Sequence, residues 1–215
     1  EGALLVERGK IVAAGRAAQI TCPAGAERVE AGGGFIGPGY VDLHVHGGAG
    51  ADFMDGTVEA WQTVLRAHAR HGTTSCTPTT TVAPFAQILA ALDLAGVGVA
   101  ERGFALWNGV PGVRILGAHF YGPYFAPGAQ GCHPSAALRP PVPEEYAAFL
   151  QRSEAIASAT VAPELIGAEA FSRAIVERGI CLNLGHTNAT FVEVEKALVW
   201  GVRHVDHLFC AMSDK

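Results

Sequence analysis

Short apolar stretches alternate with longer helical patterns along most of this chain, and this alternation constrains its fold more than any other feature. Six candidate strands recur in this way, at residues 40–44, 73–77, 113–119, 156–162, 180–184 and 204–207. The clearest helical windows between them are residues 58–71, 168–178 and 191–200. Strands joined by helices form parallel sheets, because each helix carries the chain back to the start of the next strand. We therefore expect an α/β fold built on a parallel sheet.

The number of strand–helix units indicates which parallel fold this is. A closed (β/α)8 barrel of the TIM type needs about 250 residues, whereas 178 of the 215 residues follow residue 37. Six units therefore predict the front part of such a barrel. Because the chain also begins with Glu1 rather than Met, we expect sequence to be missing at both ends. An open doubly wound sheet, which six strands could complete, is the alternative.

The first residues follow a different pattern. Two apolar runs flank the polar turn Glu7-Arg8-Gly9-Lys10, as in a β-hairpin. A glycine cluster at residues 32–34 then marks a boundary near residue 37. We expect residues 1–37 to be the N-terminal β segment of a small β-sandwich domain. Residues 38–215 are expected to form the barrel, from its first strand to about its sixth.

Composition excludes several classes of partner. The formal net charge is −5 and 49% of the residues are hydrophobic, so the chain lacks the basic surface that nucleic acids or anionic membranes require. It also lacks an apolar run of the ~18 residues that cross a membrane. The five cysteines are scattered without a Cys-x-x-Cys pair, which is typical of reduced thiols. We expect a cytoplasmic protein with neither a nucleic-acid nor a membrane partner.

Four histidines fall at the carboxyl ends of predicted strands: His44, His46, His186 and His207. In an α/β barrel, active sites form at that rim. Because alternate strand residues share a face, His44 and His46 point to the same side. Imidazole is a common ligand for divalent metals. The pattern predicts a metal site, with zinc as the first choice and iron, cobalt or nickel also suited.

Three other histidines carry a weaker signal. His68 and His71 lie near the end of a predicted helix, where a histidine usually serves the helix dipole and the solvent. His204 lies near the start of the last predicted strand, away from the rim. We expect none of the three to be functional.

Residues 38–47, Pro-Gly-Tyr-Val-Asp-Leu-His-Val-His-Gly, resemble the amidohydrolase signature, and the rest of the chain resembles the N-acetylglucosamine-6-phosphate deacetylase family. The supporting motifs are Gly72-Thr73-Thr74 with Thr77-Pro78-Thr79, Gly117-Ala118-His119 with Gly122-Pro123, Gly131-Cys132-His133, Ala162-Pro163-Glu164, Gly185-His186-Thr187-Asn188-Ala189, and His207-Leu208-Phe209 with Ala211-Met212. They occur in family order and cover nearly the whole chain.

The resemblance implies a metal-dependent amide hydrolase that removes the acetyl group from an N-acetylated amino sugar, N-acetylglucosamine 6-phosphate in the first place. The small-molecule partner would then be an amino sugar. Matched to the family motifs, His186 and His207 correspond to core metal ligands, and His44 and His46 to the pair found in members with a second metal. His133 corresponds to a sugar-contacting histidine.

The remaining matches concern the phosphate and the general base. Cys210 and Ala211 correspond to a segment that meets the substrate phosphate, although the family has Asn where this chain has Cys210. The aspartate expected as general base would lie beyond Lys215. Asp206 stands where the family motif has Thr, and Tyr121 stands where the family has a glutamate that binds the metal. A phenol must lose a proton near pH 10 to be a good ligand.

These departures leave two alternatives open. The chain could be a catalytically inactive binding or regulatory relative, or an amidohydrolase that acts on a different amide. If a metal is bound, some carboxylate should replace the missing glutamate, and Glu164, at the end of the fourth strand, is the candidate. The other interpretation is that Glu164 only opens the following helix. The apolar surface of an incomplete barrel would also favour a homo-oligomer.

Overall fold

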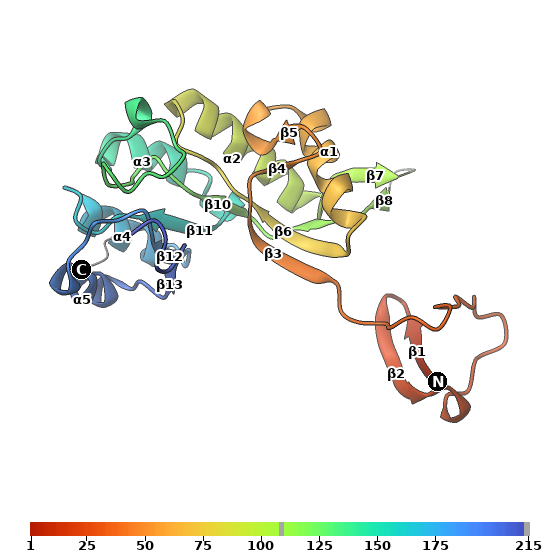
Figure 1. The fold of residues 1–215 in the computed structure, drawn as a ribbon. Coiled ribbons are helices and arrows are strands. Elements are labelled where there is room, and N and C mark those ends of the chain that lie inside the picture. The colour runs from red at the N-terminus through yellow and green to blue at the C-terminus, as the bar shows by residue number, and fades with distance from the viewer. Residues whose placement is uncertain (108–109, 213–215) are drawn as a thin grey trace. The chain divides into compact units, whose positions relative to one another are not determined.

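The computed structural model describes residues 1–107 and 110–212 (Figure 1). It divides into two compact units, Glu1–Pro38 and Gly39–Lys215. In the first unit, β1 (Gly2–Glu7) and β2 (Lys10–Arg16) pair antiparallel, with Glu7 opposite Lys10 across a two-residue turn. A short 3-10 helix, η1 (Ala17–Gln19), follows. The hairpin expected from the apolar runs is confirmed.

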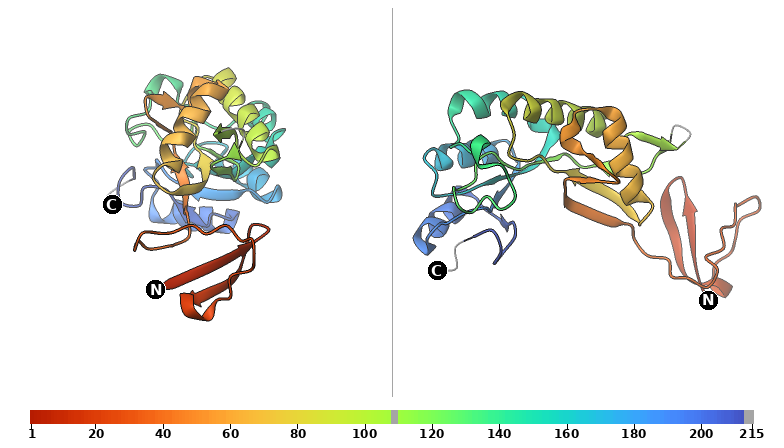
Figure 2. Two further views of the ribbon diagram at one scale, coloured as in Figure 1. Left: turned by 90° about the vertical axis from the view of Figure 1, so that its right-hand side faces the viewer. Right: turned by 45° about the horizontal axis from the view of Figure 1, so that its top comes forward.

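Two parallel sheets form the framework of the second unit (Figure 2). One has the order β3 (Tyr40–Val45), β6 (Thr73–Pro78), β9 (Arg114–Ile115), and the other has the order β10 (Ala118–Phe120), β11 (Ile156–Val161), β12 (Cys181–Leu184), β13 (His204–Val205). A parallel bridge between Thr79 and His119 connects them. Strands that follow each other in the sequence are neighbours throughout, as in a barrel, and the order lacks the reversal of a doubly wound sheet. The expected parallel α/β fold is confirmed.

A helix lies between successive main strands at every step except that from β9 to β10, where only Leu116 and Gly117 intervene (Figures 1 and 2). The helices are α1 (Val58–Ala69), α2 (Phe85–Ala100), α3 (Pro143–Leu150), α4 (Ala168–Glu177) and α5 (Phe191–Trp200). There are also short 3-10 helices: η2 (Phe53–Asp55), η3 (Ser135–Ala137) and η4 (Ser153–Ala155). Two short antiparallel strand pairs complete the unit: β4 (Gly47–Gly48) with β5 (Ala51–Asp52), and β7 (Ala105–Trp107) with β8 (Val110–Pro111). No helix of residues 1–107 and 110–212 is long and apolar enough to cross a membrane.

Local capping explains where the best-marked helix begins. At the start of α5, Glu193 accepts a hydrogen bond from the backbone N–H of Thr190 at 2.8 Å, and the Thr190 side chain caps the N–H of Glu193 in return. This capping box satisfies two backbone donors that have no partner within the helix. Helix α2 lacks such a signal, because Pro84 precedes it without a side-chain cap and Gly96 and Gly98 interrupt its pattern. The sequence therefore marks α2 less clearly than α5.

Two predicted strands differ from the structure. The strand expected over residues 113–119 is two strands, because the chain turns at Gly117, where φ is +124° and a Cβ would lie 2.8 Å from the backbone nitrogen of Ala157. This turn moves the chain from the neighbour of β6 to the neighbour of β11. The last strand ends at Val205 rather than at His207, whose φ of 51° is incompatible with a strand.

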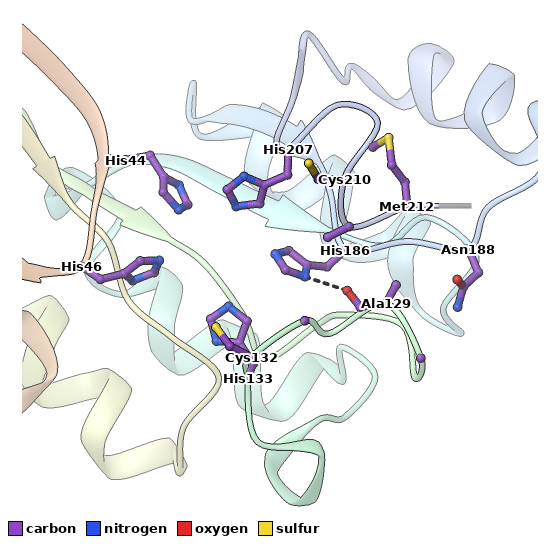
Figure 3. Close-up of a pocket in the computed structure, with 13 residues that line it drawn as sticks. His44, His46, Ala129, Cys132, His133, His186, Asn188, His207, Cys210 and Met212 are labelled. Atoms are coloured by element: carbon purple, nitrogen blue, oxygen red, sulfur yellow. Dashed lines mark hydrogen bonds between the residues drawn. The ribbon is translucent and has the colours of Figure 1, made fainter. Parts of the chain in front are cut away.

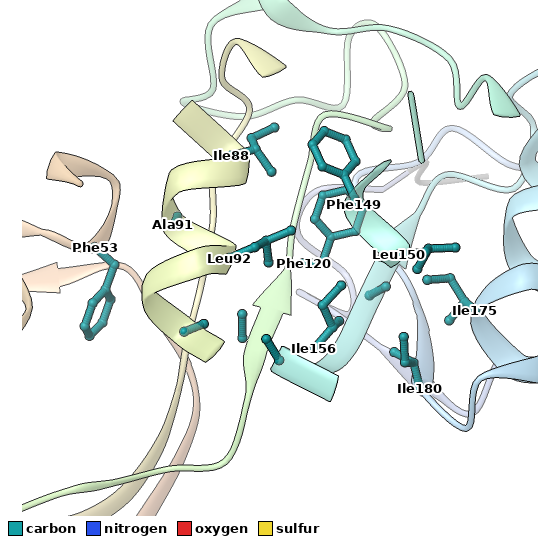
Figure 4. Close-up of a cluster of buried hydrophobic side chains, with 14 of the residues drawn as sticks. Phe53, Ile88, Ala91, Leu92, Phe120, Phe149, Leu150, Ile156, Ile175 and Ile180 are labelled. Atoms are coloured by element: carbon teal, nitrogen blue, oxygen red, sulfur yellow. The ribbon is translucent and has the colours of Figure 1, made fainter. Parts of the chain in front are cut away.

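The core of the second unit lies between the helices and the sheets (Figure 4). Leu92 of α2 faces Phe120 of β10, and Phe149 of α3 packs beside Phe120 with ring centroids 5.1 Å apart. All three side chains are fully buried. Because these residues fix the outer faces of the strands, the carboxyl ends of the strands are held in register for the site described below.

The aromatic centre of this core gives a direct test of packing. Phe171 of α4 is fully buried, and its ring lies 5.0 Å from that of Tyr124 and 5.5 Å from that of Tyr146. We predict that Phe171→Ala lowers the free energy of unfolding by about 3–5 kcal/mol, because it leaves a cavity. Phe191→Ala is the control, because Phe191 is 74% exposed, and it should cost no more than about 0.5 kcal/mol. Equal losses in urea titrations of the two variants would contradict this packing.

Candidate metal centre

A cavity of about 680 Å³ opens at the carboxyl ends of the strands (Figure 3). Its lining comes from the end of β3 and from the loops after β10, β12 and β13. The residues that line it are His44, His46, Gly128, Ala129, Gly131, Cys132, His133, His186, Asn188, His207, Cys210, Ala211 and Met212. The structure thus brings together all four histidines of the predicted metal site, together with His133, Cys210 and Ala211 of the expected substrate site.

The imidazoles are close enough to act on one small molecule or ion. The ring centroids of His44 and His46 are 4.9 Å apart, those of His44 and His207 are 5.0 Å apart, and those of His186 and His207 are 5.4 Å apart. His133 lies 5.3 Å from His186 by the same measure. The first strand and the segment after the last strand therefore contribute neighbouring side chains, although His44 and His207 are 163 positions apart in the sequence.

Five histidines of the cluster are kept neutral by their surroundings. Burial, reinforced by the neighbouring imidazoles, lowers the pKa of His44 and of His119 to about 3. Burial likewise lowers the pKa of His133 to about 4, and it lowers the pKa values of His46 and His186. A neutral imidazole keeps a free lone pair, which is the form that binds a cation.

One group in the described residues has the composition of a metal site: His44, His119 and Asp206, whose potential ligand atoms all lie within 4.8 Å of one another. The Nδ1 atoms of His44 and His119 face each other at 3.2 Å. The Nε2 atom of His119 lies 3.7 Å from Oδ2 of Asp206. Two imidazoles and a carboxylate are ligands that suit zinc and its neighbours.

The carboxylate of Asp206 is positioned by the two neighbouring strands. The Thr160 hydroxyl on β11 donates to Oδ2 of Asp206, and the Asn183 amide on β12 donates to Oδ1 at 2.9 Å. A Cβ at position 185 would lie 3.0 Å from the Cβ of Asp206, so only Gly185 lets the chain approach this closely without a shift. These contacts orient the carboxylate toward His119.

Both ring nitrogens of His186 have a hydrogen-bond partner. Its Nδ1 lies 2.8 Å from the carbonyl oxygen of Ala129 (Figure 3), and its Nε2 contacts the hydroxyl of Tyr121. Because a carbonyl can only accept, Nδ1 carries the proton and Nε2 accepts from Tyr121. Burial raises the pKa of Tyr121 above its ordinary value, so the phenol stays neutral and remains a donor.

The backbone at two of these histidines is strained. His186 has a φ of 50° and His207 a φ of 51°, in the left-handed region that costs a residue other than glycine of order 1–3 kcal/mol. Such conformations persist where the surrounding structure enforces them, and they cluster at functional sites. In this chain they turn both imidazoles into the cavity.

Glu164 does not lie in the group with the histidines. Its carboxylate accepts hydrogen bonds at 2.5 Å from the Thr187 hydroxyl and at 2.5 Å from the backbone N–H of Asn188. Both partners belong to the loop that follows His186. The structure therefore groups Asp206, rather than the candidate Glu164, with the histidines, because the loop already uses the Glu164 oxygens.

Sequence reasoning missed two residues of the His44–His119–Asp206 group. His119 ends the third predicted strand, and Asp206 immediately precedes His207, so their places at strand ends were visible signals.

The expectation for His68 needs a correction as well. His68 does not serve only the solvent, because it is half-buried against the hairpin after β3, where its Nε2 lies 3.1 Å from the carbonyl oxygen of Gly47.

Comparisons with known proteins identify the family. The scan against family models found no match. The chain is 36% identical over 176 residues to the N-acetylglucosamine-6-phosphate deacetylase of Vibrio furnissii, an alignment that covers 81% of this chain and 42% of that protein. It is 34% identical over 181 residues to an N-acetylgalactosamine-6-phosphate deacetylase of Escherichia coli O157:H7, covering 82% of this chain and 45% of that protein. The chain belongs to the N-acetylhexosamine-6-phosphate deacetylase family.

Solved structures of this family share the fold. The N-acetyl-D-glucosamine-6-phosphate deacetylase of Mycobacterium smegmatis superposes with a TM-score of 0.82 at 29% identity, over 99% of this chain and 53% of that one. A mutant of that enzyme in complex with N-acetyl-D-glucosamine-6-phosphate gives a TM-score of 0.81 at 28% identity, over 99% and 52%. The chain thus spans about half the length of the deacetylases that it matches.

The place of Glu164 yields a prediction. We expect Glu164→Gln to leave zinc affinity within about threefold, because the side chain lies outside the His44–His119–Asp206 group. The variant should unfold more easily, by about 1–2 kcal/mol, because two charge-assisted hydrogen bonds are weakened. Zinc titration and thermal unfolding measure the two effects separately. A large loss of zinc affinity would make Glu164 a ligand and would contradict this assignment.

Proposed function

We propose that this deacetylase-family protein is a metal-dependent amide hydrolase that removes the acetyl group from an N-acetylated amino sugar, with N-acetylglucosamine 6-phosphate as the first substrate. The cavity lined by five imidazoles is the observation that supports the proposal most strongly. The deacetylase names of the relatives support the substrate class. So does the complex of a related enzyme with N-acetyl-D-glucosamine-6-phosphate.

The donor set fits a divalent cation, zinc in the first place, with iron, cobalt or nickel as alternatives. When bound, such an ion polarises an amide carbonyl and lowers the pKa of a water molecule beside it. His44 and His119 offer nitrogen lone pairs to it, and Asp206 offers a negative charge. Strands β3 and β10 and the chain after β13 hold these three side chains ready before any ligand arrives.

The other pocket residues are suited to holding the sugar. His133 is neutral, so its ring can donate one hydrogen bond to a sugar hydroxyl and accept another. Cys210 and Ala211 border the cavity where the family resemblance expects the phosphate. The buried ring of Phe125 stacks on that of His186 with centroids 4.2 Å apart and so packs against the imidazole that lines the cavity.

A second candidate substrate class is favoured by one specific observation. Among the described residues that line the cavity, none is lysine or arginine. The carboxylate of Glu164 also lies directly behind the Asn188 backbone, which forms part of the lining. Phosphate recognition usually draws on cationic side chains, so an unphosphorylated N-acyl substrate is the second candidate.

The proposal predicts acetate release that depends on the metal and on the pocket. With zinc supplied, the protein should release acetate from N-acetylglucosamine 6-phosphate, and a chelator should abolish the reaction until zinc is restored. His133→Gln should raise KM more than it lowers kcat, because His133 contacts the sugar rather than the reacting amide. The matched control is His71→Gln on the surface beyond α1, which should leave both constants unchanged.

The outcome across substrates separates the alternatives. Turnover of N-acetylglucosamine or other neutral amides in preference to the phosphorylated sugars would support the second candidate. Binding of the sugar phosphate without acetate release, in zinc-loaded protein, would contradict the enzyme proposal and indicate a binding or regulatory relative. N-acetylgalactosamine 6-phosphate belongs in the same panel, because one relative carries that substrate in its name.

A further inference from the structure

We infer that the chain holds its cation on His44, His119 and Asp206, below the cavity, and that the Tyr121 hydroxyl keeps His186 out of the ligand set. The inference rests on the metal dependence of the proposed function but not on its substrate. It assigns the negative ligand to the end of the last described strand, and it assigns His186 to a hydrogen bond rather than to the ion.

The spacing of the nitrogen atoms fits a shared ion. Zinc–nitrogen bonds of about 2.0–2.1 Å in a tetrahedral arrangement separate two ligand nitrogens by about 3.3 Å. The Nδ1 atoms of His44 and His119 are 3.2 Å apart. The potential ligand atom of Asp206 lies within 4.8 Å of the other two. Its carboxylate now lies beside Nε2 of His119, so it would move toward the Nδ1 side of that ring to complete three bonds.

The protons are arranged to leave the facing nitrogen of His119 free. The Thr160 hydroxyl gives its proton to Asp206, so the Thr160 oxygen accepts from Nε2 of His119 at 2.7 Å. With Nε2 protonated, a neutral His119 presents the lone pair of Nδ1 toward His44. Histidines that bind metals are generally oriented in this way, by donating their other N–H to a neighbouring group.

No lysine or arginine of residues 1–107 and 110–212 forms an ion pair with Asp206. Its side chain is 12% exposed, and its ion-pair partner in that part of the chain is the imidazole of His119 at 3.7 Å. A buried carboxylate is costly without a cation beside it. A divalent ion between Asp206 and the two imidazoles would supply that charge, and the single carboxylate would offset part of the charge of the ion.

The side chain of Tyr121 lies between this group and His186. Its ring lies 4.6 Å from that of His44 and 5.1 Å from that of His119, while its hydroxyl contacts Nε2 of His186. Both nitrogens of His186 are then used, so the ring has no lone pair left for an ion. His44 lines the cavity, whereas His119 is 1% exposed. An ion on the group would therefore be reached from the cavity, with a position open to substrate.

Zinc binding to a set of variants tests the inference. Zinc is titrated into the apo protein in competition with a chromogenic chelator, using the wild type, His119→Gln, Asp206→Asn and His186→Gln. We expect His119→Gln and Asp206→Asn to weaken zinc binding by about 100-fold or more, and His186→Gln to change it by less than about threefold. Thr160→Val should weaken it by about 10–100-fold, as loss of an orienting partner does.

Controls separate lost ligands from lost folding. Asp93→Asn makes the same chemical change at a surface ion pair with Arg152, and it should bind zinc like the wild type. Circular dichroism in the presence of a chelator should give every variant the wild-type spectrum. The absorption of the cobalt-substituted wild type supplies a second readout, because three nitrogen and oxygen ligands with an open position give the intense bands of a four- or five-coordinate ion.

The results either support the inference or overturn it. Loss of zinc in Asp206→Asn and His119→Gln, with zinc retained in His186→Gln, supports it. Retained affinity in Asp206→Asn, or a loss in His186→Gln as large as that in Asp206→Asn, overturns it, and so does a wild type that binds no zinc. Acetate release measured on the same samples tests the proposed function separately, since the predicted zinc pattern without acetate release would sink only that proposal.

Discussion

The parallel direction of the strands is the constraint on which the site depends. The main strands of the second unit run parallel, so the residues at the end of β3 and in the loops after β10, β12 and β13 enter one common space. His44 on β3 and His207, which follows β13, meet there with ring centroids 5.0 Å apart. An antiparallel sheet would have sent half of these side chains to the opposite edge, and no cluster of imidazoles would form.

The packing below the strands and the loops above them keep this cluster in place. Buried aromatic residues such as Phe120 and Phe149 fix the strands from the outside. On the inside, the Glu164 carboxylate holds the loop after His186, and the missing side chain at Gly185 leaves room for Asp206 to approach Thr160. The strained backbone of His186 is thus maintained by contacts that lie on both sides of it.

The arrangement bears on Tyr121, which stands where the family has a metal-binding glutamate. Tyr121 lies in the middle of the histidines, where a neutral phenol can donate to His186 but contributes no charge. A negative charge is available instead from Asp206, beside His119. In the assignment that we propose, the cluster keeps one carboxylate among its ligands, but after a different strand from the one that the family resemblance implies.

Local patterns predicted the features that depend on local structure. The turn Glu7-Arg8-Gly9-Lys10 predicted the hairpin, and the spacing of His44 and His46 predicted that both rings share one face. The pairing of His119 with Asp206 could not be predicted in this way, because it depends on how the twisted sheet β10-β11-β12-β13 brings the end of β10 near the end of β13. For Glu164 the local pattern was misleading. Its position at a strand end suggested a metal ligand, but its oxygens accept hydrogen bonds from Thr187 and Asn188.

The position of a bound ion tests the central claim most directly. Crystals of the protein grown with zinc should give one anomalous difference peak at the zinc absorption edge. The account predicts that this peak lies about 2.0–2.2 Å from the Nδ1 atoms of His44 and His119 and from an oxygen of Asp206, with the Tyr121 hydroxyl still on His186. A peak bound by His186 and His207 instead, with Asp206 left on Thr160 and Asn183, would contradict it.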